Sequence, residues 1–492
     1  MIIGRTARHA APVRVTYGRM RRVTRIAIVG GGPGGYEAAL VAAQLGAQVT
    51  LVERTGVGGA CVLTDCVPSK TLIATSEAMT SLALSPRLGV RFDGGDDHDA
   101  GTIAVDLAQV NARVRALAKA QSDDIAARLR AEGVTQLCGT ATMRGATVSG
   151  RRVAVSTPDG GSEELEADVV LLATGAQPRI LPTAMPDGER ILTWHQVYEL
   201  DELPERLVVV GSGVTGAEFA GAYQALGSQV TLVSSRDRVL PGEDADAAGV
   251  VEAVFTRRGM TVVNRARAAA VERTAGGVIV RLADGGVVEG THCLMAVGSL
   301  PNTEGLGLDE AGVRRSASGY VEVDRVSRTS ASGIYAAGDC TGVLMLASVA
   351  AMQGRIAMWH ALGEAVHPLR LSTVAANVFT DPEIATVGVT QKAIDEGGVE
   401  ARAVKLPLAR NPRAKMAGIT DGFVKLFARP GTGLVLGGVV VAPRASELIL
   451  PVSMGVQLGL TVDQVAQTFS VYPSLSGSIT EAGRQLMETH LD

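Results

Sequence analysis

Residues 25–35 read Arg-Ile-Ala-Ile-Val-Gly-Gly-Gly-Pro-Gly-Gly, an apolar run followed by a glycine-rich turn. The run predicts a buried strand, and residues 36–45 predict a helix. Gly30, Gly32 and Gly35 give the pattern G-x-G-x-x-G in a strand–turn–helix setting. Gly30 permits the tight turn, Gly32 lets the backbone approach a pyrophosphate, and Gly35 lets the helix pack closely on the strand. The stretch therefore predicts a nucleotide-binding βαβ unit.

The same unit occurs a second time. Residues 206–216 read Arg-Leu-Val-Val-Val-Gly-Ser-Gly-Val-Thr-Gly, and another strand is expected at 229–233. In the first copy the strand at 48–52 precedes Glu53, a carboxylate placed to accept hydrogen bonds from ribose hydroxyls. Repetition of a whole unit seldom arises by chance, so the chain is predicted to be an α/β protein with two Rossmann-like nucleotide-binding domains. The second fingerprint contains Gly211, Gly213 and Gly216.

Each copy closes with an apolar strand and a glycine turn. From the first glycine to that turn the copies span 144 and 86 positions, so the first copy contains an insertion of 58 residues. A further apolar strand ends in Gly338-Asp339, which puts a carboxylate at the end of a strand where ligands bind in such sheets. The closing turns are Thr174-Gly175 in the first copy and Val297-Gly298 in the second.

The insertion holds residues 58–70, Gly-Gly-Ala-Cys-Val-Leu-Thr-Asp-Cys-Val-Pro-Ser-Lys. Cys61 and Cys66 lie five positions apart and can form a disulfide if this stretch starts a helix, although the geometry of that bond is demanding. Two unpaired, buried thiols are the alternative. A long helix is expected near 105–132. The remaining cysteines are expected in or near the core: Cys138, Cys293 and Cys340.

The second copy has Ser234 at the position of Glu53 in the first. A carboxylate there would repel the 2'-phosphate of NADPH, whereas Ser234 and the nearby Arg236 can bind it. The sequence therefore favours NADPH slightly over NADH. The alternative is that Arg236 and Arg238 only face solvent.

The composition limits the classes of function. A net charge of −4 and an aromatic content of 3% argue against a nucleic-acid partner. No apolar run of about 18 residues suits a membrane span. Five scattered cysteines suit a reducing compartment, so we expect a cytoplasmic protein, and their spacing predicts no metal site.

Beyond about residue 371 the pattern changes, and no glycine fingerprint occurs. Strands are expected at 423–427 and 434–441, and helices at 445–458 and 462–468. This segment is predicted to be a separate α+β domain. Because it carries no ligand signature, we expect it to form a dimer interface.

With these motifs assembled, the chain resembles the flavoprotein disulfide reductases from about Thr24 almost to its C-terminus. The resemblance rests on both fingerprints, the C-x4-C-x3-K stretch and three further motifs: Ala173-Thr174-Gly175, Gly298-x-x-Pro301-Asn302, and Ile334 to Asp339. It implies that the first copy binds FAD and that the second binds NAD(P)H. It also implies a homodimer.

The resemblance further implies roles for single residues. Cys66 corresponds to the cysteine that contacts the isoalloxazine, and Cys61 corresponds to the interchange thiol. Lys70 and Glu218 correspond to an ion pair near the flavin N5, and Asp339 to an acid that contacts FAD. The first 22 residues are basic and lack acids, and they are expected to be a disordered tail or to precede the true start. The segments that the resemblance implies are the FAD-binding domain in two parts at 23–178 and 299–370, the NAD(P)H-binding domain at 179–298, and the dimerisation domain at 371–492.

One departure from the family pattern decides the predicted function. In the family, a histidine base in the pattern His-Pro-x-x-x-Glu deprotonates the interchange thiol. Residues 472–477 of this chain read Tyr-Pro-Ser-Leu-Ser-Gly instead. A phenol with a pKa of about 10 is a poor base for a thiol with a pKa of about 8.5. His490 lies well past the motif. Efficient reduction of lipoamide or glutathione is therefore not expected.

Hydride transfer from NAD(P)H to FAD does not need that base, and reduced flavin can pass electrons directly to a quinone. The Tyr472 segment resembles that of NAD(P)H quinone reductases within the family. We therefore predict an FAD-dependent NAD(P)H:quinone oxidoreductase, in which Tyr472 shapes the acceptor pocket or only fills space at the subunit boundary. The alternatives are a disulfide reductase or transhydrogenase that uses another base, and a flavin redox sensor with little turnover.

Overall fold

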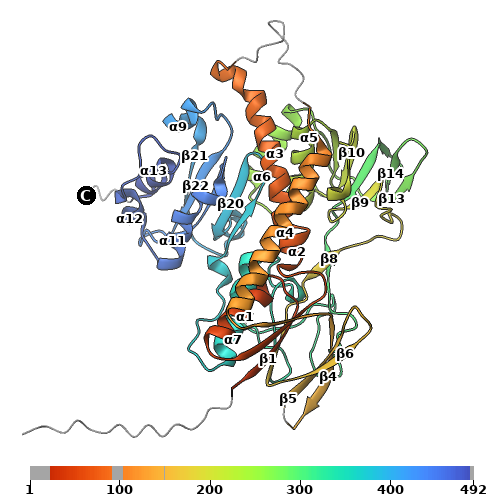
Figure 1. Cartoon of the computed structure of the whole chain (residues 1–492). Helices are drawn as coiled ribbons and strands as arrows, with labels where there is room; N and C mark the ends of the chain where they lie inside the picture. The colour runs from red at the N-terminus through yellow and green to blue at the C-terminus, as the bar shows by residue number, and fades with distance from the viewer. Residues whose placement is uncertain (1–22, 91–103, 149, 488–492) are drawn as a thin grey trace, which may run out of the picture.

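The computed structural model describes residues 23–90, 104–148 and 150–487. The predictions for residues 1–22 and for His490 lie outside these ranges. In Figure 1 the two nucleotide-binding folds lie one above the other, and the C-terminal domain lies beside the upper one.

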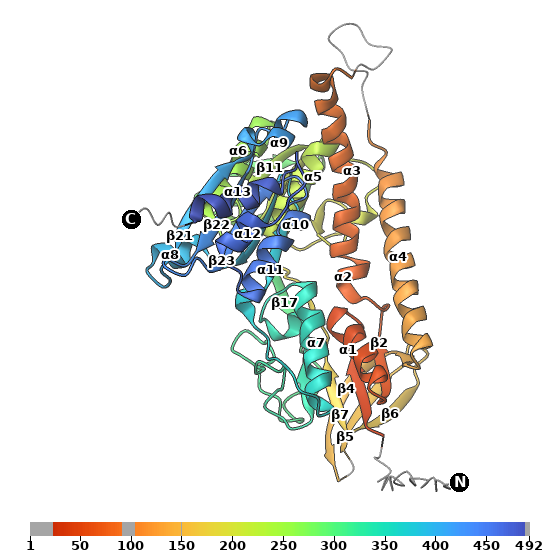
Figure 2. The ribbon, with the colours of Figure 1, turned by 90° about the vertical axis from the view of Figure 1, so that its left-hand side faces the viewer.

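The first fold is built on five parallel strands in the order β18-β7-β1-β2-β3. Strands β1, β7 and β18 are apolar and almost entirely buried, whereas β3 is partly exposed at the edge of the sheet. Helix α1 packs against α7 (Figure 2). Helix α1 starts three residues earlier than predicted, because Pro33 suits a first helical turn. The elements are β1 (Arg25–Val29), α1 (Pro33–Gln44), β2 (Gln48–Glu53), β3 (Thr135–Cys138), β7 (Val169–Leu172), β18 (Ile334–Ala336) and α7 (Ala347–Ala361).

The second fold repeats this plan, with strand order β12-β11-β10-β16-β9. The first two strands of both copies pair at the same offset, Arg25 with Gln48 and Arg206 with Gln229. The equal offset confirms the predicted repeat. The elements are β9 (Ile191–Thr193), β10 (Arg206–Val210), α5 (Val214–Leu226), β11 (Gln229–Val233), α6 (Ala245–Arg257), β12 (Thr261–Val263) and β16 (His292–Met295).

Each copy also contains a three-stranded antiparallel sheet before its closing strand, which the sequence patterns did not predict. A pair of short strands, β8 and β17, connects the two folds. The strands are β4 (Thr140–Thr147), β5 (Gly150–Ser156) and β6 (Ser162–Ala167) in the first copy, β13 (Ala268–Arg273), β14 (Val278–Leu282) and β15 (Val287–Gly290) in the second, and β8 (Ala176–Pro178) and β17 (Ser299–Pro301) between them.

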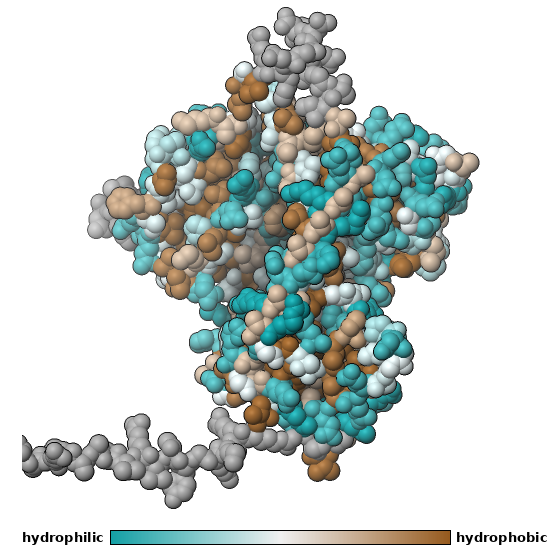
Figure 3. Space-filling model, in the orientation of Figure 1, coloured by the Kyte–Doolittle hydropathy of each residue, from teal (hydrophilic) through white to brown (hydrophobic). Residues whose placement is uncertain are grey.

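The insertion forms α2 (Gly59–Leu63), α3 (Cys66–Leu84) and α4 (Leu107–Ala131), which confirms the predicted long helix. Both ribbon views show α3 and α4 side by side. Residues of α4 at spacings of three and four are buried, while its outer face carries hydrophilic side chains (Figure 3). Helix α3 also packs on α5, so the insertion joins the two nucleotide-binding folds.

The C-terminal domain has an antiparallel sheet in the order β19-β20-β23-β22-β21. Two of its strands were predicted to within one residue at each end. The helix predicted at 445–458 is divided, because Pro451 cannot donate the hydrogen bond that would continue α10 into α11. The elements are β19 (Ala375–Val378), β20 (Glu383–Gly388), α8 (Gln391–Asp395), β21 (Arg402–Pro407), α9 (Pro412–Met416), β22 (Phe423–Ala428), β23 (Val435–Ala442), α10 (Ala445–Leu448), α11 (Leu450–Leu458), α12 (Val462–Gln467) and α13 (Gly477–Leu486).

A buried ion pair joins this domain to the second nucleotide fold. Lys425 Nζ of β22 lies 2.8 Å from Asp244 Oδ2, and both side chains are only 4% exposed. Asp244 also caps α6, where its carboxylate accepts hydrogen bonds from two main-chain N–H groups. Lys425 Nζ lies 2.7 Å from the half-exposed carboxylate of Asp246 as well. The contact between the two domains therefore includes a charge pair removed from water.

The three isolated cysteines differ in burial. Cys293 and Cys340 are buried, as predicted. The prediction for Cys138 was wrong: its side chain is exposed, because β3 is an edge strand of the first sheet.

Candidate functional site

Two consecutive helices bring the paired cysteines together. Cys61 lies in α2, and Cys66 is the first residue of α3. The link between the helices is tight, since Asp65 N–H donates to Ala60 O at 2.8 Å and Asp65 O accepts from Ser69 N–H at 2.7 Å. Both thiols are free and partly buried, and they form a hydrogen bond with each other. A disulfide between them stays a prediction.

The hydrogen bond makes the two thiols unequal as acids. It stabilises a thiolate at Cys61 and so lowers the pKa of that thiol. The same hydrogen bond, followed by burial, raises the pKa of Cys66. The protein alone therefore favours one thiolate in the pair and resists a second.

Lys70 lies on the first turns of α3 and reaches the second nucleotide fold. Its Nζ lies 2.8 Å from Glu218 Oε2 on α5, and the Glu218 side chain is 4% exposed. Burial alone would lower the pKa of Lys70, but the attraction and hydrogen bond of Glu218 outweigh it, so the pKa is raised. The structure thus brings together two residues that are 148 positions apart.

Phe379 completes this ion pair and was missed by the sequence analysis. Its main-chain N–H donates to Glu218 Oε1 at 2.9 Å, and its ring centroid lies 4.6 Å from Lys70 Nζ. Phe379 follows β19 in the C-terminal domain, and no motif surrounds it. Only a family resemblance could have indicated that Lys70 and Glu218 meet, and nothing indicated Phe379.

The first glycine turn has the shape that a dinucleotide needs. Gly30 has φ of +102°, and a Cβ there would lie 2.2 Å from Ala173 O. A Cβ on Gly35 would lie 1.9 Å from Gly30 O, so helix and strand approach too closely for any side chain. A Cβ on Gly32 would meet nothing within 4 Å. Two glycines therefore permit packing, and the third leaves open space where a pyrophosphate can approach.

Further predicted FAD contacts line the ends of the strands. Glu53 Oε2 accepts from Gly31 N–H at 2.7 Å, which holds the carboxylate beside the glycine turn. Thr174 Oγ1 donates to Asn302 O at 2.7 Å. Burial raises the pKa of Asp339, the first residue of a short 3-10 helix (Asp339–Thr341). Gly175 and Gly338 occupy the turns after β7 and β18. These residues fit FAD, because hydrogen-bond acceptors for its hydroxyls and an open turn for its phosphates lie together at the carboxyl ends of the parallel strands.

The second glycine turn repeats the geometry. A Cβ on Gly211 would lie 2.1 Å from Ala296 O, and one on Gly216 would lie 1.8 Å from Gly211 O. A Cβ on Gly213 or Gly298 would meet nothing within 4 Å. Space for a second dinucleotide is therefore present at the same place in the repeat.

The structure corrects the part predicted for Ser234. Its side chain is fully buried, and its hydroxyl lies 2.6 Å from Ser212 Oγ and accepts from Arg236 N–H. It cannot bind a phosphate directly, because Ser234, the residue after β11, lies in the interior. The side chain of Arg236 is exposed and stays available.

Tyr472 lies apart from the cysteines within one chain. It belongs to the segment between α12 and α13, and it is 82% exposed. Both ribbon views place these helices on the side of the molecule away from α2. Among the residues that the structure describes, the Tyr472 side chain forms no hydrogen bond with the cysteine stretch.

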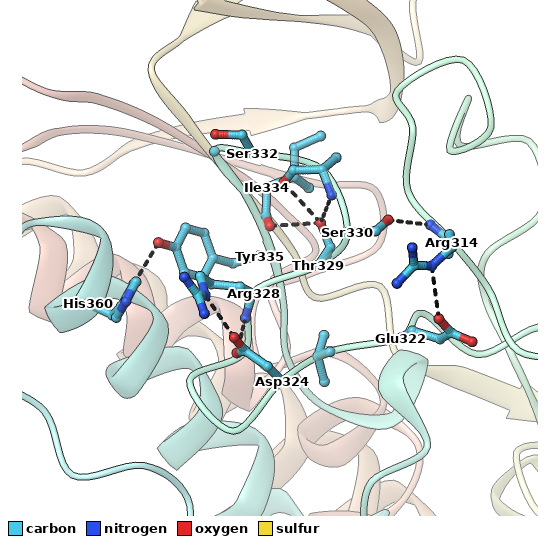
Figure 4. A pocket seen from close by; sticks show the side chains of 13 residues that line it. Arg314, Glu322, Asp324, Arg328, Thr329, Ser330, Ser332, Ile334, Tyr335 and His360 are labelled. Carbon is cyan, nitrogen blue, oxygen red and sulfur yellow. Dashed lines mark hydrogen bonds and ion pairs between the residues drawn. The ribbon is translucent and has the colours of Figure 1, made fainter.

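A separate pocket of about 660 Å³ lies beside β18, away from both glycine turns. Figure 4 shows that its charged groups are paired with each other. Arg328 Nε lies 2.7 Å from Asp324 Oδ2, and Tyr335 Oη lies 2.8 Å from His360 Nδ1. Arg314 pairs with Glu322 in the same way. The pocket shares no residue with the cysteine site.

Within the described residues, none of the helices combines the length and hydropathy that crossing a lipid bilayer requires. No three His, Cys, Asp or Glu side chains of that part of the chain are grouped as metal ligands.

The sequence of this chain is similar to a family of known proteins along nearly its whole length. Residues 24–354 match the family described as pyridine nucleotide-disulphide oxidoreductase, and residues 374–483 match the dimerisation domain of that family. The chain is 58% identical over 94% of both sequences to a protein from Mycobacterium tuberculosis named NAD(P)H dehydrogenase (quinone). It is 35% identical to dihydrolipoyl dehydrogenase of Chlorobaculum tepidum, over 94% of this chain and 97% of the relative.

Solved structures agree with the sequence comparison. The crystal structure of LpdA from M. tuberculosis superimposes with a TM-score of 0.90 at 58% identity, and the match covers 95% of this chain and all of that one. The HOCl-induced flavoprotein disulfide reductase RclA from Escherichia coli gives a TM-score of 0.81 at 24% identity, over 94% of this chain and 99% of RclA. The second match supports the fold alone.

Proposed function

This chain belongs to the pyridine nucleotide-disulphide oxidoreductases, and from that membership we propose that it transfers electrons from NAD(P)H through FAD to a quinone-like acceptor. The C-terminal segment carries the proposal, because it offers the phenol of Tyr472 where the resemblance requires an imidazole. The 58% identity to a protein named for quinone reduction supports the same acceptor class.

When bound, FAD supplies the two-electron chemistry. Gly32 and the amino end of α1 would hold its pyrophosphate, and Glu53 would accept hydrogen bonds from its ribose. Lys70, held by Glu218, places a positive charge beside the paired thiols. Gly213 and α5 would hold NAD(P)H in the same way in the second fold. Neither nucleotide site needs a protein base.

Steady-state assays test the proposal. With NADPH as donor, we expect turnover of menadione and little turnover of lipoamide, because the C-terminal motif supplies no imidazole to deprotonate Cys61. The paired cysteines and the 35% identity to a dihydrolipoyl dehydrogenase favour disulfide reduction as a second candidate. Lipoamide turnover as fast as menadione turnover would establish that candidate instead.

Cys61→Ser is expected to leave quinone reduction within a few fold of the wild type. If the acceptor takes electrons at the flavin, the outer thiol is not on their path. Cys138→Ser is the matched control, because Cys138 is exposed and lies outside the site. Loss of nearly all menadione turnover in the first variant alone would put the dithiol on the path. Initial rates with saturating NADPH measure the difference.

The proposed preference for NADPH rests on Arg236. We expect Arg236→Glu to lower kcat/KM for NADPH about tenfold and to change kcat/KM for NADH little, since only NADPH carries the 2'-phosphate that a guanidinium binds. Arg265→Glu makes the same change of charge at a nearby exposed residue that pairs with Asp237. An equal loss of kcat/KM with NADPH and NADH, or equal effects of the two variants, would contradict the proposed role of Arg236 in a preference for NADPH.

The proposed homodimer would bury apolar side chains of the C-terminal domain. Leu450, Met454 and Leu458 follow one another at spacings of four on α11 and are at least half exposed. Phe469 and Val471 are exposed next to Tyr472. Such side chains on the domain that matches a dimerisation family support an interface with a second copy. Sedimentation velocity measures the state directly.

A further inference from the structure

A second cavity adjoins the pocket of Figure 4, and no part of the proposed electron path uses it. Its volume is about 740 Å³, and it shares Val323, Asp324 and Arg328 with that pocket. Three separate parts of the chain line it: residues 323–328, residues 369–372 and helix α7. The volume lies within the range of about 300–1,000 Å³ that is usual for sites of small molecules.

The charges that line this cavity do not cancel. Three arginines and one aspartate line it, so its net charge is +2. The aspartate, Asp324, is already engaged, because its Oδ2 lies 2.7 Å from Arg328 Nε and its Oδ1 accepts from two main-chain N–H groups at 3.0 Å. The other two arginines, Arg325 and Arg370, form no ion pair within the described part of the chain. The cavity therefore attracts anions.

Arg325 and Arg370 start from adjacent main-chain positions. Leu369 N–H donates to Arg325 O at 2.9 Å, and Arg325 Nε donates to Leu369 O at 3.4 Å. Arg370 is the next residue, and both arginine side chains are exposed. Two neighbouring guanidinium groups repel each other until an anion lies between them. Their forked N–H groups match the oxygens of a phosphate or a carboxylate.

Gln353 of α7 gives the same cavity a buried polar wall. It is 1% exposed, its Oε1 accepts from Gly338 N–H at 2.8 Å, and its Nε2 donates to Thr341 Oγ1 at 3.4 Å. Because Nε2 carries two hydrogens, one of them has no acceptor among the residues that the structure describes. The cavity thus extends from two exposed cations to a buried donor, which a ligand can use.

We propose that this cavity binds a small organic anion, with a phosphate or carboxylate group between Arg325 and Arg370 and a further acceptor on Gln353 Nε2. Both kinds of anionic group accept two parallel N–H bonds, so they share the chemistry that the arginines recognise. Apolar side chains of Val326 and Leu371 also line the cavity, and they suit a short carbon skeleton. The site lies outside the proposed electron path and goes beyond the proposed function.

Isothermal titration calorimetry of the FAD-loaded protein tests the inference. The probes are citrate, which carries carboxylates, and glycerol 3-phosphate, and the ionic strength is kept constant because salt screens exposed charges. We expect one site per chain for at least one probe. Arg325→Gln and Arg370→Gln should each raise its dissociation constant about tenfold or more, since each removes hydrogen bonds to a charged group. Thermal unfolding curves should not change, because both side chains are exposed.

Two control variants make the outcome decisive. Arg325→Lys keeps the charge but loses the fork, so its dissociation constant should lie between those of the wild type and Arg325→Gln. Arg236→Gln removes the exposed arginine of the predicted NADPH site and should leave binding unchanged. The probe that binds more tightly identifies the anionic group. No saturable binding of either probe at millimolar concentrations, equal dissociation constants in the wild type and both glutamine variants of the cavity, or a loss confined to Arg236→Gln would each overturn the inference.

Discussion

Lys425→Met is expected to lower the free energy of unfolding by about 3 kcal/mol, because it leaves Asp244 buried without its charged partner. Both side chains of the pair are 4% exposed, and their atoms lie 2.8 Å apart. The hydrogen bonds that Asp244 accepts as the cap of α6 remain, so we expect the lower end of the range for a broken buried pair. Urea unfolding of the FAD-free chain, followed by circular dichroism, measures the change.

The same strand region provides the control. Lys405 Nζ pairs with Asp246 Oδ1 at 3.0 Å, but both side chains are about half exposed. Lys405→Met should therefore cost less than about 1 kcal/mol. Asp244→Asn combined with Lys425→Met should recover part of the loss, because it removes the unpaired charge. Equal losses of unfolding free energy in Lys425→Met and Lys405→Met would mean that burial does not make the Lys425 pair contribute more to stability than the exposed pair.

Gly213→Val is expected to weaken NAD(P)H binding about a hundredfold, or about 2.7 kcal/mol, and to leave the fold intact. Gly213 has φ of −72°, which any residue adopts, and a Cβ there would meet nothing within 4 Å. The side chain would instead fill the space through which the pyrophosphate approaches the backbone. Titration of bound flavin fluorescence with NADP+, which binds the same turn but cannot reduce the flavin, gives the dissociation constant, and a thermal unfolding curve gives the stability.

Gly216→Ala is the matched contrast in the same turn. Its Cβ would lie 1.8 Å from Gly211 O, so strand and helix would have to separate. We expect a lower melting temperature for this variant and not for Gly213→Val. An unchanged dissociation constant in Gly213→Val would show that this turn does not receive the nucleotide.

Strong local patterns explain why much of the fold was predictable. An apolar strand, a glycine turn and a helix each carry a signal within about ten residues, and the strands of both βαβ units were predicted to within one residue. The three-stranded antiparallel sheets were missed, because their half-exposed strands lack continuous apolar runs. Pro451 was a readable signal that was overlooked.

The site was predictable only in part. The spacing of Cys61 and Cys66 and the two glycine turns are local features. The structure gives the glycine turns the expected shape and places Cys66 at the start of a helix. The pairing of Lys70 with Glu218 spans 148 positions and was accessible only through a family resemblance. The contact of Phe379 with the ion pair and the burial of Ser234 both depend on how distant segments pack. The sequence pattern of a single segment does not contain this information.

Glu218 receives its two donors from different parts of the molecule. It projects from α5 of the second nucleotide fold, Lys70 comes from the insertion in the first, and Phe379 comes from the C-terminal domain. A chain shortened before β19 would keep both nucleotide folds and still lose one of those donors. Chimaeras that exchange a single domain between relatives must for the same reason preserve the backbone path at position 379, or the lysine will face a carboxylate that is no longer held in place.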